Sequence, residues 1–127
     1  MIVIDASAVI DQLVGGDAAA GVERHTAYGA EELHAPHVVD LEVLQVLRRT
    51  RQSHDVVIDF LDLPIERYPH TLLVPRVWEL RHNFTAFDAS YVALAEGLGG
   101  DARLLTSDRR LAGAVRKHTD VEVLLAA

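Results

Sequence analysis

The chain has 127 residues, of which 50% are apolar and 24% are charged, so we expect one globular domain over residues 1–127 with its own core. The absence of cysteine excludes disulfides and thiolate metal sites, and the lack of a signal-peptide pattern or a long apolar run predicts a cytoplasmic protein. The 19 acidic residues outweigh the 12 basic ones and give a net charge of −7, so any binding to nucleic acid must come from local chemistry.

The first half of the chain begins with a short strand and continues mainly as helices. Ile2-Val3-Ile4 is an unbroken β-branched run that ends at Asp5, which is typical of a strand covered on both faces in a parallel sheet. We expect Ser7 to cap the first helix, and Pro36 to lie in the first turn of a later one. The spacing of apolar residues predicts helices over 7–14, 18–28, 37–51 and 54–63, and a weak strand over 33–35.

The second half alternates short strands with helices. Strands are predicted over 65–68, 103–105 and 121–125, and helices over 72–82, 85–98 and 109–118. Such alternation requires right-handed crossovers between parallel strands. The sequence therefore predicts a three-layer α/β/α sandwich with a central parallel β-sheet.

Four carboxylates stand out by their positions in this scheme. Asp5 ends the first strand and Asp108 follows the strand 103–105, so both acids can reach the same edge of the sheet. Glu42 has valines three and four residues away and therefore points along an apolar helix face, where a lone carboxylate is costly. Asp88 lies in the first turn of its helix, where the backbone favours negative charge.

A divalent cation accounts for all four acids together. Hard cations such as Mg²⁺ take oxygen ligands, and carboxylates gathered from distant segments repel one another without a cation. In such a site the metal polarises a phosphoryl oxygen, activates water and stabilises the leaving oxygen.

Four sequence segments surround these acids in chain order: MIVIDAS at 1–7, PHVVDLEVL at 36–44, TAFDASYVALA at 85–95 and LTSDRRL at 105–111. This set resembles the PIN-domain family, and specifically the VapC toxins of bacterial toxin–antitoxin pairs. The match covers nearly the whole chain in the right order. Four ordered motifs in a chain of this length are far more specific than one.

The resemblance implies a PIN-like nuclease domain with Mg²⁺- or Mn²⁺-dependent endoribonuclease activity that leaves 5′-phosphate and 3′-hydroxyl ends. It also implies inhibition by a VapB-type antitoxin and a homodimer. By the same resemblance the catalytic and metal-binding acids are Asp5, Glu42, Asp88 and Asp108, and the supporting hydroxyl residues are Ser7 and Thr106.

Each of the four acids also has an ordinary structural interpretation. Asp5 and Asp108 can cap the helices that follow them, and Asp88 can form a capping box with Thr85. Glu42 can reach solvent or pair with an arginine. All of these remain open at the level of sequence.

Other polar and aromatic residues are interpreted structurally. We expect Asp40 to form a salt bridge, and Asp11 to lie on the solvated surface. His34 and His37 are unlike a zinc pair because Pro36 interrupts their register. We expect the arginines at the end of one helix to face solvent: Arg48, Arg49 and Arg51. We expect the aromatic residues Trp78 and Tyr91 to lie in the core or at an interface. For both groups the alternative is contact with RNA.

Two other function classes stay open. A haloacid-dehalogenase-like phosphohydrolase would use Asp5 as the nucleophile, but it needs a second acid where Ser7 stands. A non-catalytic acidic module would use the carboxylates to bind an arginine-bearing partner. Ser7 lacks the glycine-flanked motif of a serine hydrolase.

Overall fold

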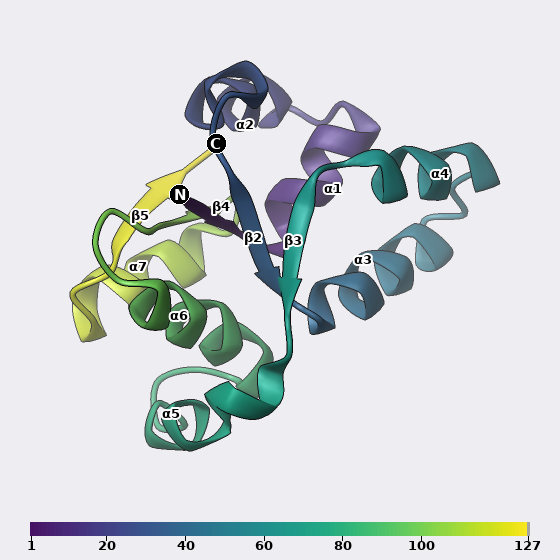
Figure 1. Cartoon of the computed structure of the whole chain (residues 1–127). Coiled ribbons are helices and arrows are strands. Elements are labelled where there is room, and N and C mark those ends of the chain that lie inside the picture. The colour runs from purple at the N-terminus through teal and green to yellow at the C-terminus, as the bar shows by residue number, and fades with distance from the viewer. Residues whose placement is uncertain (127) are drawn as a thin grey trace.

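Five parallel strands form the central sheet of the computed structural model, which describes residues 1–126 (Figure 1). Their spatial order is β3-β2-β1-β4-β5, so the first strand of the chain is the central one. The strands are β1 (Ile2–Ile4), β2 (Leu33–Pro36), β3 (Ile65–Tyr68), β4 (Arg103–Thr106) and β5 (Glu122–Leu125).

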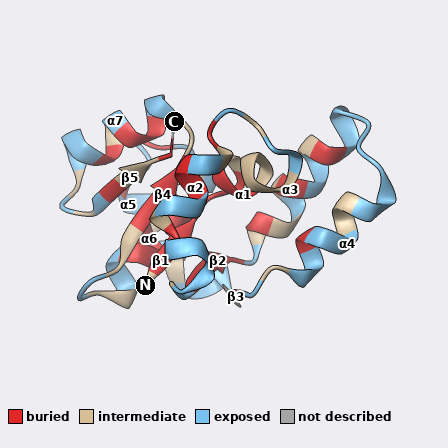
Figure 2. Ribbon diagram, turned by 90° about the horizontal axis from the view of Figure 1, so that it is seen from above, coloured by how far each residue is buried: buried red, intermediate tan, exposed pale blue. Residues whose placement is uncertain are grey.

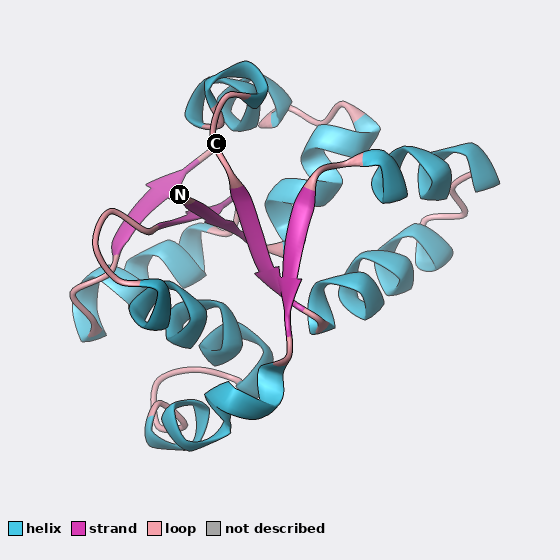
Figure 3. Ribbon diagram, in the orientation of Figure 1, coloured by secondary structure: helices cyan, strands magenta, loops and turns pink. Residues whose placement is uncertain are grey.

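Helices cover both faces of this sheet, with α1 to α4 on one side and α5 to α7 on the other (Figures 1 and 3). The helices are α1 (Ala6–Val14), α2 (Ala19–His25), α3 (Val38–Arg49), α4 (His54–Asp62), α5 (Val74–Glu79), α6 (Ala86–Leu98) and α7 (Arg109–His118). Two short 3-10 segments, η1 (Ala27–Gly29) and η2 (His70–Leu73), join them. The predicted three-layer α/β/α sandwich is confirmed. Within residues 1–126 no helix is both long and apolar enough to cross a membrane.

The core lies on both sides of β1, whose three residues are fully buried (Figure 2). On one side α6 packs against β1, β2 and β4, and the whole stretch 89–95 of that helix is buried. This stretch is rich in alanine, so the helix backbone can approach the sheet closely. Burial of β1 on both faces explains why its sequence is continuously apolar rather than alternating.

The order of the strands creates a functional edge between β1 and β4. The chain leaves β1 toward β2 and leaves β4 toward β5, so the two connections diverge and open a crevice at the carboxyl ends of these strands. Ile4 lies opposite Leu105 in the parallel register, which places Asp5 beside Thr106. The backbone N–H of Asp5 donates to the carbonyl of Leu105 at 3.1 Å and fixes this alignment.

Two sequence predictions about helix starts are wrong. Ser7 does not cap α1, because the carboxylate of Asp5 accepts the hydrogen bond from the backbone N–H of Ala8 at 3.1 Å. Pro36 does not begin a helix but ends β2, where it lies opposite Tyr68 of β3. Pairing across the sheet there is stronger than the local preference of proline for a first helical turn.

Two predicted helices are shorter than expected. The helix expected over 18–28 ends at His25, because Ala27 and Tyr28 adopt left-handed φ angles of 51° and 54°. The helix expected over 72–82 is divided into η2 and α5, with Pro75 in the first turn of α5. Proline cannot donate a backbone hydrogen bond, so an α-helix can start there but cannot run through it.

Candidate active site

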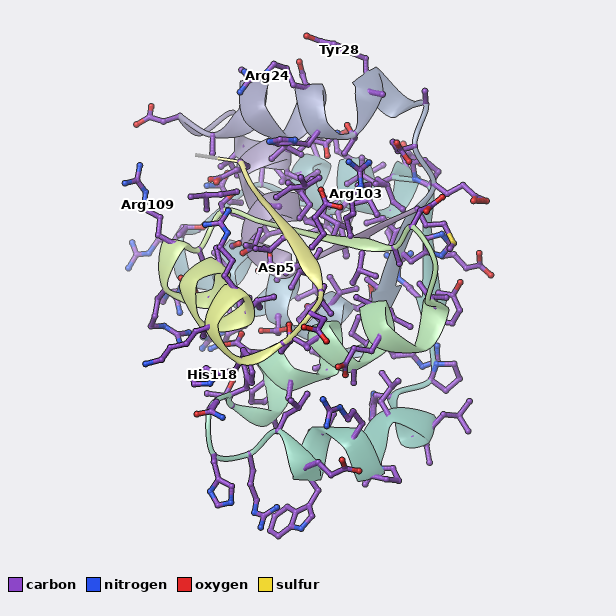
Figure 4. All side chains as sticks on the ribbon, turned by 90° about the vertical axis from the view of Figure 1, so that its left-hand side faces the viewer. Asp5, Arg24, Tyr28, Arg103, Arg109 and His118 are labelled. Carbon is purple, nitrogen blue, oxygen red and sulfur yellow. The ribbon has the colours of Figure 1, made fainter. Side chains whose placement is uncertain are left out.

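All four predicted acids line one pocket of about 850 Å³ at the crevice between β1 and β4. Each comes from a different segment of the fold. Asp5 follows β1, Glu42 lies on α3, Asp88 is in the first turn of α6, and Asp108 precedes α7. Ser7 and Tyr91 also contribute to the wall, and Arg49 lies at the far end of α3. Asp5 lies in the interior, at the end of the central strand (Figure 4).

Asp5 is the most constrained of the four acids. Its side chain is buried, with 5% of the residue exposed, and its carboxylate accepts three hydrogen bonds. Oδ1 accepts from the hydroxyl of Ser7 at 2.7 Å and from the backbone N–H of Ala8 at 3.1 Å, and Oδ2 accepts from the hydroxyl of Thr106 at 2.6 Å. A carboxylate has about four acceptor positions, so one on Oδ2 remains for a ligand in the pocket.

The pKa of Asp5 is raised from its ordinary value of 3.8 to about 6. Burial is the main cause, because it disfavours the charged form. The hydrogen bonds from Thr106, Ser7 and Ala8 oppose this rise, and the nearby charge of Asp88 adds to it. Asp5 is therefore a carboxylate held in an environment that favours a positive neighbour.

The hydroxyl groups of Ser7 and Thr106 connect the two strand ends. Each hydroxyl donates a hydrogen bond to the carboxylate of Asp5, and each accepts a hydrogen bond from a backbone N–H in the turn after β4. Ser107 donates to Ser7 at 3.0 Å, and Asp108 donates to Thr106 at 3.0 Å. The two hydroxyls lie 3.2 Å apart. This network fixes the turn that carries Asp108 relative to Asp5.

Glu42 is held by a tyrosine from the opposite side of the pocket. The hydroxyl of Tyr91, a buried residue of α6, donates to Oε1 of Glu42 at 2.6 Å. Burial raises the pKa of Glu42, the hydrogen bond from Tyr91 lowers it, and the charge of Asp88 raises it. Burial, together with the Glu42 charge, raises the pKa of Tyr91, so its hydroxyl keeps its proton and remains a donor. Glu42 does not pair with an arginine within the described residues.

Asp88 and Asp108 meet at a shared arginine. Nη2 of Arg110 lies 3.0 Å from Oδ2 of Asp88 and 3.5 Å from Oδ2 of Asp108. The expected cap by Asp108 is present, whereas only one half of the capping box expected for Thr85 and Asp88 is formed. Thr85 caps α6 by accepting from the N–H of Asp88 at 3.1 Å, and Asp108 caps α7 by accepting from the N–H of Leu111 at 3.1 Å. Capping fixes the backbone at both acids, and it uses one oxygen of Asp108 and neither oxygen of Asp88, so each carboxylate can still face another group.

Several residues outside this set behave as expected from the sequence. Asp40 forms the expected salt bridge, with Arg67 at 2.7 Å. His34 is buried, and its Nδ1 lies 2.7 Å from the hydroxyl of Tyr68. Tyr91 is a core residue, as predicted, and in addition it contacts the site.

Other expectations are corrected. Asp11 does not lie on the open surface but is half-buried and lines the pocket, because the first turns of α1 run along its wall. Trp78 is 65% exposed and is therefore not a core residue, while its other expected place, an interface, stays a prediction. Its ring instead forms a cation–π contact with Arg81, whose guanidinium carbon lies 4.3 Å from the ring centre. Of the three arginines at the end of α3, only Arg49 lines the pocket.

Two residues of the site were not assigned to it from the sequence. Arg110 follows Asp108 by two positions. A basic residue so close in sequence to a predicted metal-site acid could have indicated an ion pair at the site. Tyr91 lies three residues after Asp88, on the same helix face, which was the signal for a polar contact inside the pocket. Neither signal separates a site residue from an ordinary helix residue before the partner segment is known.

The four acids share the pocket but are not drawn together around one point. In residues 1–126 no group of three or more histidine, aspartate or glutamate side chains is arranged to hold a metal ion. The chemistry of the set nevertheless fits a hard cation, because all the donors are carboxylate oxygens and the charge of Asp88 raises the pKa of both Asp5 and Glu42.

A family model for the PIN domain matches residues 2–117. The chain therefore belongs to the PIN-domain family. Within that family it is of the VapC type. It is 38% identical to Ribonuclease VapC12 of Mycobacterium tuberculosis over 98% of this chain and 99% of that protein, and 44% identical to Ribonuclease VapC1 of the same species over 88% and 89%.

Solved structures support the same fold. The crystal structure of VapC20 from Mycobacterium tuberculosis, described as a Sarcin-Ricin loop cleaving toxin, superposes with a TM-score of 0.72 at 19% identity over 90% of this chain and 95% of that one. A toxin–antitoxin complex from Klebsiella pneumoniae gives a TM-score of 0.71 at 14% identity over 100% and 98%. At these identities the likeness concerns the fold alone.

Proposed function

We propose that this chain is a Mg²⁺- or Mn²⁺-dependent endoribonuclease toxin that is neutralised by a protein antitoxin. The observation that carries the proposal is the buried carboxylate of Asp5, held by three hydrogen bonds, in a pocket shared with Glu42, Asp88 and Asp108. Membership of the PIN-domain family and relatives named as ribonucleases support the same activity.

The cation has an identifiable set of holders. Asp5 offers the free acceptor position of Oδ2, and Glu42 offers the oxygen that Tyr91 leaves open. Asp88 and Asp108 offer the oxygens that now face Arg110. A divalent cation bound there would polarise a phosphoryl oxygen, lower the pKa of the attacking water and stabilise the leaving oxygen.

The surrounding residues position these groups. The hydroxyls of Ser7 and Thr106 prevent Asp5 from rotating, and the proton of Tyr91 fixes one oxygen of Glu42. Arg49 lies at the wall of the pocket, where its guanidinium can contact an RNA phosphate. The protein as a whole is acidic, so RNA must be held by such local contacts and by the cation rather than by a general positive field.

The partner we propose is a VapB-type antitoxin with a basic segment. A net charge of −7 and a carboxylate-lined pocket favour a partner with arginine or lysine at the contact. One of the similar structures is a toxin–antitoxin complex, which supports this class of partner. We also propose that the toxin is a homodimer, as the family resemblance implies.

The test is cleavage of RNA by the purified chain with Mg²⁺ or Mn²⁺. We expect cleavage with either ion, none with EDTA, and a loss of at least about a hundredfold in Asp5→Asn. Asp59→Asn is the matched control, because Asp59 is an exposed acid on α4, away from the pocket. Cleavage that survives both EDTA and Asp5→Asn would contradict the proposal.

The same experiment separates the two alternatives. In a haloacid-dehalogenase-like enzyme Asp5 would be the nucleophile, but Ser7 donates its hydroxyl to that carboxylate where a second acid is needed. Trapping of a phosphorylated Asp5 would restore that alternative. Intact RNA combined with no heat of Mg²⁺ binding in calorimetry would favour a non-catalytic binding module.

A further inference from the structure

Arg110 is the one arginine, within residues 1–126, that forms an ion pair with the acids of the pocket. It lies in the first turn of α7, and its Nη2 contacts both Asp88 and Asp108. The side chain is 67% exposed and is not part of the pocket wall, so it reaches the two acids from the rim. A single guanidinium nitrogen therefore supplies positive charge between two predicted cation ligands.

This contact and a divalent cation compete for the same two carboxylates. Oδ2 of Asp88 faces Arg110, and Oδ1 of Asp108 is already occupied by the backbone N–H of Leu111, which leaves Oδ2 of Asp108 for either cation. A bound ion and the guanidinium cannot both lie between these oxygens, because their positive charges repel.

The ion pair of Arg110 can be broken at little cost. Ion pairs between exposed side chains are weak and are screened by salt, and the arginine stem has several rotatable bonds. On the proposed function, the guanidinium of Arg110 would give way to a divalent cation bound by Asp88 and Asp108, because the ion carries two charges. The released group is then at the mouth of the pocket, beside the place that a phosphodiester must occupy to reach the acids.

RNA offers Arg110 a replacement partner. A phosphate accepts the planar guanidinium in two hydrogen bonds, which a charged arginine favours strongly. Contact with RNA then removes Arg110 from Asp88 and Asp108 and leaves both acids to the cation. Binding of RNA and binding of the cation should favour each other by the same factor, since coupling between two sites is reciprocal.

We infer that Arg110 is a positioning residue that couples cation binding to RNA binding: it neutralises Asp88 and Asp108 in the empty protein and moves to an RNA phosphate in the loaded one. The inference rests on the proposed function, because it takes these acids as the cation site. It assigns to Arg110 a role that neither its exposure nor its helix position alone would suggest.

The experiment measures Mn²⁺ affinity directly, by electron paramagnetic resonance of the free ion. The full chain, Arg110→Gln and the control Arg109→Gln are compared without nucleic acid. Arg109 points outward in Figure 4 and has no ion pair among the described residues. We expect Arg110→Gln to bind Mn²⁺ about three- to fivefold more tightly at low salt, with Arg109→Gln unchanged. The gain should shrink at high salt.

A second arm adds a phosphorothioate oligonucleotide that resists cleavage, with an uncharged methylphosphonate of the same length as its control. We expect the phosphorothioate to tighten Mn²⁺ binding several-fold more in the native chain and in Arg110→Lys than in Arg110→Gln, where only direct contact between phosphate and ion remains. The methylphosphonate should have no effect on any variant.

The results that overturn the inference are specific. Mn²⁺ affinity in Arg110→Gln equal to or weaker than that of the native chain would overturn it, as would equal tightening by the phosphorothioate in all variants. RNA cleavage by the native chain is measured alongside. Tighter Mn²⁺ binding in Arg110→Gln without any RNA cleavage would refute the proposed function alone, and cleavage without the predicted shifts in affinity would refute the role of Arg110 alone.

Discussion

The hydroxyl of Thr106 donates a hydrogen bond to Oδ2 of Asp5 at 2.6 Å, although the two residues are 101 positions apart in the chain. The bond joins the ends of two adjacent strands. Thr106 is fully buried, so water cannot replace this bond. The same hydroxyl accepts the N–H of Asp108 and so joins the first and fourth acids of the pocket. Loss of the hydroxyl oxygen of Thr106 should therefore disturb the positions of both Asp5 and Asp108.

The first prediction concerns Thr106→Val, which keeps the shape of the side chain and removes the hydroxyl. We expect the free energy of unfolding at neutral pH to fall by about 1–3 kcal/mol, because a buried carboxylate loses a donor. Urea denaturation measures the change. Thr71→Val, at an exposed position in η2, is the control and should be neutral. Equal stability of Thr106→Val and the native chain would show that this bond contributes nothing.

The second prediction concerns pH and the metal-free protein. The folded-state pKa of Asp5, about 6, exceeds the ordinary 3.8, so the folded chain binds this proton more tightly than the unfolded chain. The stability linked to it is complete below pH 3.8 and is lost as the pH rises through about 6, a change of about 3 kcal/mol. Urea denaturation in EDTA across this range should show the loss in the native chain.

Asp5→Asn isolates this contribution. The variant cannot ionise at position 5, so the difference in unfolding free energy between it and the native chain should grow in favour of the variant as the pH rises. Saturating Mg²⁺ should reduce that difference, because the cation compensates the buried charge. A difference that does not change with pH would contradict the raised pKa of Asp5.

The third prediction concerns Tyr91→Phe. The hydrogen bond from Tyr91 lowers the pKa of Glu42, so its removal should move the acidic limb of the pH–rate profile for RNA cleavage to higher pH. We expect the rate at neutral pH to fall about tenfold, as is usual when a partner of a metal ligand is removed. Tyr28→Phe, at a 76% exposed position, is the control. A uniform loss of rate at every pH would argue for a purely structural effect.

The fourth prediction concerns thermal stability and metal. Mg²⁺ at a hundred times its dissociation constant should stabilise the native chain by about 2.7 kcal/mol and raise its Tm. Glu42→Gln should lose most of this increase, whereas Glu23→Gln, an exposed position on α2, should keep it. Differential scanning fluorimetry with and without EDTA measures both. An equal rise in Tm for Glu42→Gln would place the bound cation elsewhere.

The fifth prediction tests the packing of α2. A Cβ at Gly21 would lie 1.8 Å from the carbonyl oxygen of Ala126, so Gly21→Ala must displace one of the two segments. We expect a loss of about 1–3 kcal/mol in unfolding free energy. Gly97→Ala, in α6 with open space around it, should instead stabilise by about 0.5–1 kcal/mol. Two variants with the same sign of change would contradict this packing.

The four acids could be predicted from the sequence because each lies at a recognisable point of the fold. Asp5 follows a continuous apolar run, and Asp108 follows a strand by three residues. Parallel strands bring such ends to one edge, so their proximity follows from the fold class alone. The alternation of strands and helices fixed that class without reference to any side-chain contact.

Contacts between distant segments could not be predicted in the same way. Asp5 and Ser7 are both good helix caps, and only the position of Thr106 decides that Asp5 caps α1 while Ser7 supports it. The pairing of Arg110 with Asp88 depends on the angle between α6 and α7, which no local pattern contains. The prediction that Asp11 lies on the solvated surface was wrong for a related reason. Several elements together form the wall of the pocket that Asp11 lines, and the sequence near Asp11 does not show them.

The position of β1 at the middle of the sheet determines when the site can exist. β1 precedes the other four strands of the sheet in the chain, yet its neighbour β4 begins only at Arg103. A growing chain that ends before that residue lacks the hydroxyl of Thr106 and the carboxylate of Asp108, and Asp5 has no partner strand on that side. Contacts of such long sequence separation form late in folding. A chain that stops before β4 therefore keeps Asp5 and Glu42 but cannot assemble the pocket around them.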